Sequence, residues 1–176
     1  MWDGRNKQIN EEAQVGVNEA TREAHDNYWS VFGSSTHVFQ EEGIQIVILD
    51  NSDIYKGISN ADWAKLEEDL SQGAKLHLVF AHMVPFHPQS THIMGSVTPA
   101  VAQQAKDLVK LLEQKKADGY FSGDLHFFAN FNSPNGSVKM TTIGAVTSAR
   151  NFQGPRFGVL TIFDDYSWDV EDVEIQ

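Results

Sequence analysis

Three apolar runs alternate with two helix-like segments in the middle of the chain, and this alternation limits the possible folds more than any other feature of the sequence. The apolar runs cover residues 44–50, 76–81 and 120–121, and the helix-like segments cover about 60–73 and 98–119. Strands joined by single helices in this way lie parallel, and right-handed connections place both helices on one face of the sheet. The nearly continuous Ile, Val and Leu of the first run also predict a strand that is buried on both faces.

Residues with capping preferences set the expected ends of the two helices. Asn60 is the predicted N-cap of the first helix, because Asn readily accepts a hydrogen bond from a free backbone N–H. Gly73 is its predicted stop, since glycine adopts the left-handed conformation common at helix ends. Thr98 and Pro99 predict the start of the second helix, with proline in the first turn.

Short turn signals separate three pairs of strand-like runs, which is typical of antiparallel hairpins. The clearest turn is Asn135-Gly136. The paired runs are 37–40 with 44–50, 128–131 with 138–143, and 157–163 with 168–175. The sequence therefore predicts an α/β (α+β) fold, in which a mixed β-sheet carries two helices on one face and antiparallel hairpins lie at the C-terminus.

The N-terminal segment differs from the rest of the chain. Residues 1–36 are polar and irregular, with a weakly helical patch at about 11–23, and clear strand patterns begin at His37. Neither repeats nor a low-complexity linker divides the remainder. We therefore expect a single domain overall, with an irregular segment at 1–36 and the folded part at 37–176.

Charge and residue usage exclude several classes of function. The chain has 13 Lys and Arg against 24 Asp and Glu, a formal net charge of −11, so binding in a nucleic-acid groove is not expected. It has no cysteine, which excludes disulfides, thiolate metal sites and cysteine nucleophiles. No secretory signal or membrane-spanning run is visible, so no membrane partner is expected and the compartment is left open.

Potential metal ligands follow two of the predicted parallel strands. His82 comes directly after residues 76–81, and Asp124 and His126 follow the strand at 120–121 across a glycine. Sites in open α/β sheets form at the carboxyl ends of strands. Imidazole nitrogen and carboxylate oxygen suit zinc, manganese or iron. His82, Asp124 and His126 are therefore the predicted metal ligands.

Two further histidines lie on the long loop after His82. His87 and His92 could contact a phosphate or a leaving group near the metal. They could equally be solvated loop histidines without a chemical role. Both interpretations stay open at the level of sequence.

Four stretches in order along residues 30–175 resemble the calcineurin-like metallophosphoesterases, nearest the branch that includes purple acid phosphatases. The first two resemble the family's hydrophobic strand ending in Leu-Asp and its Trp-containing helix, and the other two its His-x-Pro and Gly-His-x-His ligand loops. These stretches are 45–52, 61–70, 80–86 and 121–126. The resemblance implies half of a four-layer αββα sandwich.

The resemblance also implies a chemistry. The family activates a hydroxide with two divalent metals and hydrolyses phosphomonoesters or phosphodiesters. By position, His82 would bind the second metal and His126 the first, while Asp124 replaces a histidine of the motif. An aspartate can still coordinate through oxygen, but its shorter reach and added charge change geometry and metal preference; loss of that ligand is equally compatible with the sequence.

The family's Asp-x-His, Gly-Asp-x-x-Asp and Gly-Asn-His-Asp/Glu motifs are absent. We therefore expect the C-terminal half of a longer enzyme acting on a phosphoester small molecule, with weak or no turnover as this chain alone. Two alternatives are a non-catalytic binding or scaffold module and a reduced one-metal hydrolase. A lone half would expose an apolar sheet face, which predicts a homo-oligomer packed sheet against sheet.

Overall fold

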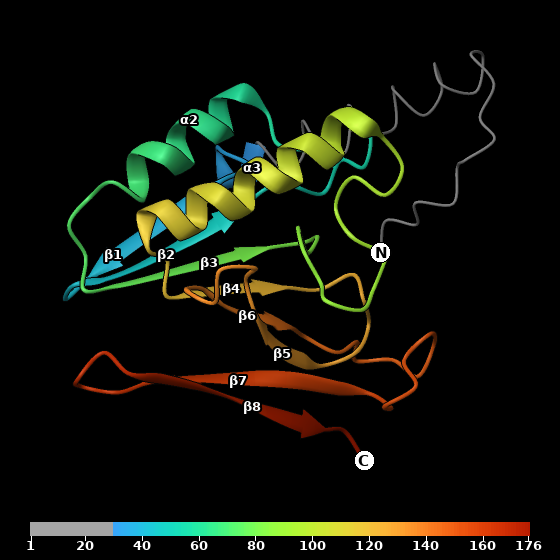
Figure 1. Ribbon diagram of the computed structural model, residues 1–176. Coiled ribbons are helices and arrows are strands. Elements are labelled where there is room, and N and C mark those ends of the chain that lie inside the picture. The colour runs from blue at the N-terminus through green and yellow to red at the C-terminus, as the bar shows by residue number, and fades with distance from the viewer. Residues whose placement is uncertain (1–29) are drawn as a thin grey trace. The chain divides into compact units, whose positions relative to one another are not determined.

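The computed structural model describes residues 30–176, of which residues 36–176 form one compact unit. Figure 1 shows this unit as three layers: two helices, a central sheet and a two-stranded hairpin. Most of the predicted irregular segment at 1–36 lies outside the described residues, so the domain boundary stays a prediction. Within the described part, none of the helices is long and apolar enough to cross a membrane.

The central sheet is mixed, as the alternation predicts. Its strands lie in the order β1-β2-β3-β4-β6-β5; β2, β3, β4 and β6 run parallel, and the edge strands β1 and β5 are antiparallel to their neighbours. The register pairs Ala81 with Ser122, so His82 and Gly123 leave the sheet side by side. The bounds are β1 His37–Glu41, β2 Ile44–Leu49, β3 Leu76–Ala81, β4 Gly119–Ser122, β5 Ala129–Asn132 and β6 Lys139–Thr142.

Both helices cover the same face of this sheet, which confirms the predicted arrangement (Figure 1). Helix α2 spans Asn60–Asp69 and helix α3 spans Pro99–Lys115. Side chains from both helices form one buried cluster with the facing residues of β2, β3, β4 and β6. Its fully buried members include Val47, Val79, Tyr120, Leu66 and Leu108.

The predicted caps of the first helix are wrong in detail. Ser59 is the N-cap: its hydroxyl accepts a hydrogen bond from the backbone N–H of Asp62, and Asn60 is already helical. Ser and Asn have similar capping preferences, so the sequence did not separate the two neighbours. At the other end, Leu70 caps the helix, three residues before Gly73.

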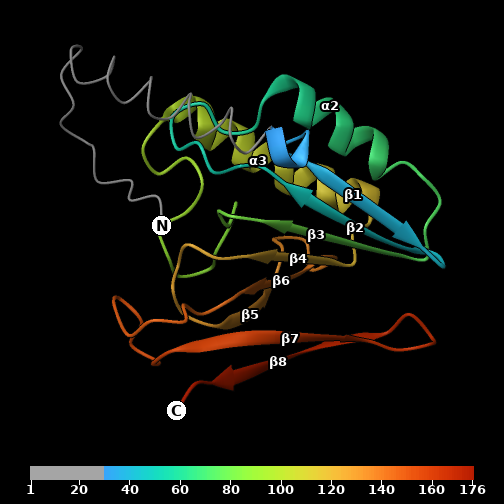
Figure 2. The same cartoon turned by 180° about the vertical axis from the view of Figure 1, so that it is seen from behind.

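The hairpin of β7 (Arg156–Ile162) and β8 (Trp168–Glu174) covers the middle of the opposite face (Figure 2). Trp168 lies edge-on to Phe121 of β4, with ring centroids 5.3 Å apart. At the tip of the hairpin, the Tyr166 hydroxyl donates to the carbonyl of Glu42 at 3.1 Å. The second face therefore has its own small core, formed over β3 and β4.

The prediction that the first apolar strand is buried on both faces is wrong. Gln45, Val47 and Leu49 of β2 are buried under the helices, but Ile48 on the other face is 41% exposed. Phe39 on the neighbouring strand β1 points to the same face and is 58% exposed. The difference arises because the hairpin reaches Ile44 but leaves the outer part of β1 and β2 uncovered.

Candidate functional site at the carboxyl edge of the sheet

A buried asparagine holds the turn after β3, where His82 stands. The Asn51 side chain is fully buried, and its Oδ1 accepts hydrogen bonds from the backbone N–H groups of His82 and Met83, both at 2.9 Å. Its Nδ2 donates to the Met83 carbonyl at 2.8 Å and to the Tyr120 hydroxyl at 3.2 Å. These bonds fix the backbone that carries His82.

Tyr120 of β4 also bonds to this turn. Its hydroxyl donates to the Met83 carbonyl at 2.8 Å. Burial raises the pKa of Tyr120 well above its ordinary value, which outweighs the opposite effect of its hydrogen bond with Asn51. The phenol therefore stays protonated and keeps its role as donor. Asn51 and Tyr120, which are buried beneath the helices, therefore hold the turn that carries His82.

The loop after β4 presents Asp124 and His126 in an unusual backbone conformation. Both residues have positive φ, 62° and 65°. This left-handed region costs a non-glycine residue on the order of 1 kcal/mol and is often found at functional sites. The Gly123 N–H donates to the His82 carbonyl at 3.0 Å, which joins the two loops, and the Ala145 N–H donates to the His126 carbonyl.

Two histidines flank the carboxylate of Asp124. Nε2 of His82 lies 3.8 Å from Oδ1, and Nε2 of His92 lies 3.3 Å from Oδ2. The His82 and His92 side chains are more than half exposed, while Asp124 is about a quarter exposed. The structure therefore brings together two of the predicted metal ligands and one of the two predicted substrate-binding histidines.

The third predicted ligand, His126, has a different environment. Its Nδ1 is buried and has no hydrogen-bond partner, a state that costs free energy unless another group satisfies it. The donor types of His82, Asp124 and His126 fit a divalent transition metal. However, among residues 30–176 no three His, Asp or Glu side chains form a group that could hold a metal ion. The donors fit in chemistry, but those described make up an incomplete set.

His87, the other predicted substrate-binding residue, packs between aromatic rings. Its ring centroid lies 4.7 Å from that of Phe131 and 5.6 Å from that of Phe127, both edge-on. Its Nδ1 accepts hydrogen bonds from the backbone N–H groups of Gln89 and Ser90, at 3.1 and 2.8 Å. Burial lowers the pKa of His87 below its ordinary value. Its contact with a substrate stays a prediction.

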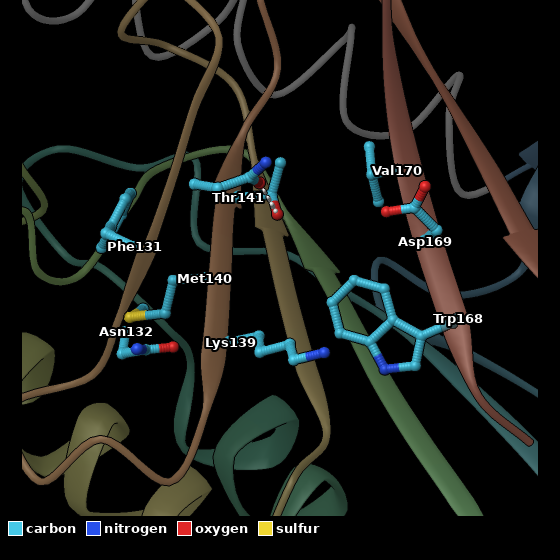
Figure 3. A pocket seen from close by; sticks show the side chains of 9 residues that line it. Phe131, Asn132, Lys139, Met140, Thr141, Trp168, Asp169 and Val170 are labelled. Atoms are coloured by element: carbon cyan, nitrogen blue, oxygen red, sulfur yellow. Dashed lines mark hydrogen bonds between the residues drawn. The ribbon is translucent and has the colours of Figure 1, made fainter.

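Two cavities lie on the described surface. One, of about 470 Å³, is lined by the rings of His87, Phe127, Phe131 and Phe152 and also by Ser90 and Asn130. The other, of about 300 Å³, is the groove between β5 and β6 on one side and β8 on the other (Figure 3). There the Lys139 ammonium lies 4.9 Å from the centre of the Trp168 ring. Neither Asp124 nor His82 lines either cavity.

Comparisons with solved structures show which known fold this chain resembles. A purple acid phosphatase, PPD1 from seeds of yellow lupin (Lupinus luteus), aligns with a TM-score of 0.52 and 15% identity, covering 79% of this chain and 30% of that one. The fold is metallophosphoesterase-like. Weaker alignments are to GAP50, described as the anchor in the inner membrane complex of Plasmodium (TM-score 0.47, 18% identity, 79% and 45% covered), and to a putative 5'-nucleotidase from Staphylococcus aureus (0.43, 14%, 80% and 29%).

The metallophosphoesterase-like fold is thus supported by structure alone. No protein-family model matches the sequence, and no match was found among curated proteins. The chain spans less than half the length of each of the three solved structures. Its fold class is therefore confirmed, whereas its activity and ligands are matters for proposal.

Several residues around the site were not singled out from the sequence. Asn51 carries the turn at His82, and Phe127, Phe131 and Phe152 form the aromatic cavity. A polar residue shortly after an apolar strand was an available signal for Asn51. Phe127 and Phe131 are four residues apart, but Phe152 lies 21 residues further along the chain, so only the fold reveals that the three line one cavity.

Proposed function

We propose that this chain is the C-terminal part of a metal-dependent phosphoesterase that hydrolyses phosphomonoesters or phosphodiesters. The observation that carries the proposal is the placement of His82 and His92 on either oxygen of Asp124, at the carboxyl edge of a metallophosphoesterase-like sheet. Nitrogen and oxygen donors gathered at such an edge are typical of a catalytic metal centre.

In this proposal the chain supplies part of the coordination shell. His82, Asp124 and His126 are the proposed metal ligands. The Nδ1 of His126 is buried without a hydrogen-bond partner, which supports the view that a group such as a metal ion binds there in the complete site. Zinc, manganese or iron would polarise the phosphoester and lower the pKa of a bound water. The role of Asn51 is to hold His82 in place, which limits the freedom of one donor before any metal arrives.

The described donors are too few for efficient turnover. A catalytic zinc generally requires three well-arranged protein ligands, and no such group forms within residues 30–176. We therefore expect weak or no hydrolysis by this chain alone. The missing ligands would come from the preceding half of the longer enzyme that the resemblance implies.

A reduced one-metal hydrolase is the second candidate. The observation that favours it is the 3.3 Å approach of His92 to Asp124, which brings a second imidazole to this carboxylate. A metal would have to draw His82, Asp124 and His92 closer together, because these three do not form a metal-holding group in the structure. In this alternative His92 is a metal ligand and not a substrate contact. The third possibility is a non-catalytic module that keeps the fold and binds no metal.

The uncovered part of the sheet face supports the proposal of a protein partner. Phe39 and Ile48 lie exposed beside the hairpin on a face whose middle is already a packed core. Apolar side chains gathered in this way favour association. We expect a second copy of this chain to cover them, standing in for the half of the sandwich that the resemblance implies.

Metal titration separates the three functional candidates. Binding of Zn²⁺ and Mn²⁺ to the purified chain is measured by calorimetry, together with hydrolysis of p-nitrophenyl phosphate and bis(p-nitrophenyl) phosphate. Asp124→Ala removes the central carboxylate, and Asp107→Ala, on the surface of α3, is the matched control for loss of a carboxylate.

The outcomes are distinct. Saturable binding that Asp124→Ala weakens at least tenfold, with little hydrolysis, supports an incomplete phosphoesterase site. Binding together with hydrolysis that His92→Ala abolishes favours the one-metal hydrolase. Absence of binding, or equal weakening by Asp107→Ala, contradicts both and leaves the non-catalytic module.

A further inference from the structure

Four aromatic rings form a continuous row along the 470 Å³ cavity. Phe131 contacts His87, His87 contacts Phe127, and the Phe127 centroid lies 5.5 Å from that of Phe152. The row starts at the core, because Phe131 also packs against the helix-covered cluster. Its other end is open, because Phe152 is 81% exposed. The cavity therefore offers aromatic surface at several depths.

The exposure of Phe152 is not a result of a loose loop. Its neighbour Asn151 is buried, and the Asn151 side chain donates to the carbonyls of Ala145 and Gly154. On its other side, the Gln153 amide bonds both the N–H and the carbonyl of Phe128, at 2.6 and 3.1 Å. A large apolar ring is thus held in water by a fixed backbone, where a ligand that covered it would gain burial energy.

His87 gives the cavity a defined polarity. Because its Nδ1 accepts from two backbone N–H groups, its proton must lie on Nε2 while the ring is neutral. Asn130 contributes an amide to the same lining, although its Oδ1 already accepts from Thr141. While His87 is neutral, none of the described lining residues carries a formal charge. An uncharged ligand group therefore fits this cavity best.

The cavity shares a wall with the His82–Asp124–His92 cluster. His87 and Ser90 line the cavity, and the hydroxyl of Ser90 accepts from the backbone N–H of His92 at 3.1 Å. On the opposite side, Phe127 lines the cavity and directly follows His126. The segment 87–92 and the loop 124–127 thus contribute to both places.

We propose that this cavity binds a neutral planar aromatic ring, carried by the alcohol portion of the phosphoester whose phosphate is held at the neighbouring cluster. The position of the phosphate rests on the proposed function, whereas binding of the ring does not. Aromatic rings prefer edge-to-face and offset contacts with each other, which an aliphatic group of the same size cannot make.

The test uses uncharged probes, without phosphate or metal. Saturation-transfer NMR titrations compare 2-naphthol with its saturated counterpart 2-decalol. We expect saturable binding of 2-naphthol only, weakened roughly 3- to 10-fold by both Phe152→Ala and Phe152→Leu, because each removes a ring contact, and retained in Phe152→Tyr. Phe163→Ala, at an exposed site outside the cavity, is the control and should leave binding unchanged.

Equal binding of 2-decalol, no saturable binding of 2-naphthol, or equal effects of Phe152→Ala and Phe163→Ala would each overturn the proposal. A second titration isolates the proposed function: added Zn²⁺ should tighten 2-naphthyl phosphate but not 2-naphthol. If Zn²⁺ tightens neither while 2-naphthol still binds through Phe152, the phosphoesterase proposal fails and the aromatic site is supported.

Discussion

The two faces of the central sheet are built from the same strands but are closed to very different degrees. On the helix-covered face, Val47, Leu66 and Leu108 have no exposed surface. On the other face, the hairpin covers Leu76, Leu78 and Phe121, while Phe39 and Ile48 remain 58% and 41% exposed. One face is a finished core, and the other is finished only in its middle.

This difference shows which parts of the molecule are held in place by residues of this chain alone. Asn51 and Tyr120, which hold the turn at His82, both belong to the finished side. The predicted site is therefore organised without a partner, even though its donors are incomplete. The unfinished face leaves Phe39 and Ile48 exposed, and the second copy proposed above would cover them.

The largest expected effect is loss of a core side chain on the finished face. Leu108→Ala should lower the free energy of unfolding by about 2–5 kcal/mol, because it removes buried methyl groups and leaves a cavity. Ile48→Ala on the open face should cost less than about 1 kcal/mol, because much of that side chain is already in water. Urea unfolding of both variants measures the difference. Equal losses would show that the open face is buried in solution.

The second prediction concerns the turn that carries His82. Asn51→Ala should cost about 3 kcal/mol, since it removes the acceptor of the buried N–H of Met83 and of the partly buried N–H of His82. Tyr120→Phe, the milder control, keeps those two bonds and should cost only about 1 kcal/mol. Urea unfolding gives both values. A smaller loss in Asn51→Ala than in Tyr120→Phe would contradict the positioning role of the amide.

Much of this fold follows from patterns visible in the sequence. The parallel strands, both helices and all three hairpins were predicted, because apolar periodicity and turn residues are local signals. The wrong helix caps have a local cause, because the neighbours Ser59 and Asn60 have similar capping preferences, whereas the error at β2 has a non-local one. The open face of β2 could not be predicted, since continuous Ile, Val and Leu look the same whether or not a second layer covers them.

The site was predicted less completely than the fold. Strand ends pointed to His82 and Asp124, and topology brings these two together. Whether His87 or His92 would join them depended on the path of an irregular loop, which carries no periodic signal. The structure places His92 at Asp124 and His87 among aromatic rings instead.

A smaller effect is expected from pH at His87, which lines the aromatic cavity. The pKa of this residue is lowered in the folded state by burial, so the unfolded chain binds the proton more tightly. Stability should therefore decrease as pH falls from the ordinary histidine pKa toward the lowered one, because a proton on Nδ1 removes the acceptor for Gln89 and Ser90. Urea unfolding at several pH values should show a shallower slope in His87→Asn, and an unchanged slope would contradict this assignment.

The smallest expected change in folding stability, and the most direct test of the open face, comes from Phe39→Ser combined with Ile48→Ser. Both side chains are substantially exposed, so the free energy of unfolding should change by less than about 1 kcal/mol in a dilute sample. Self-association should be lost if a second copy covers this face, because hydroxyl groups would replace its apolar contacts. Light scattering at micromolar concentrations measures the mass, with Phe163→Ser as a control that changes a ring of similar exposure (51%) elsewhere. A wild-type chain that stays monomeric would show that the second layer is not supplied by another copy of this chain. A lower mass in the double variant alone would assign that role to the exposed surface of β1 and β2.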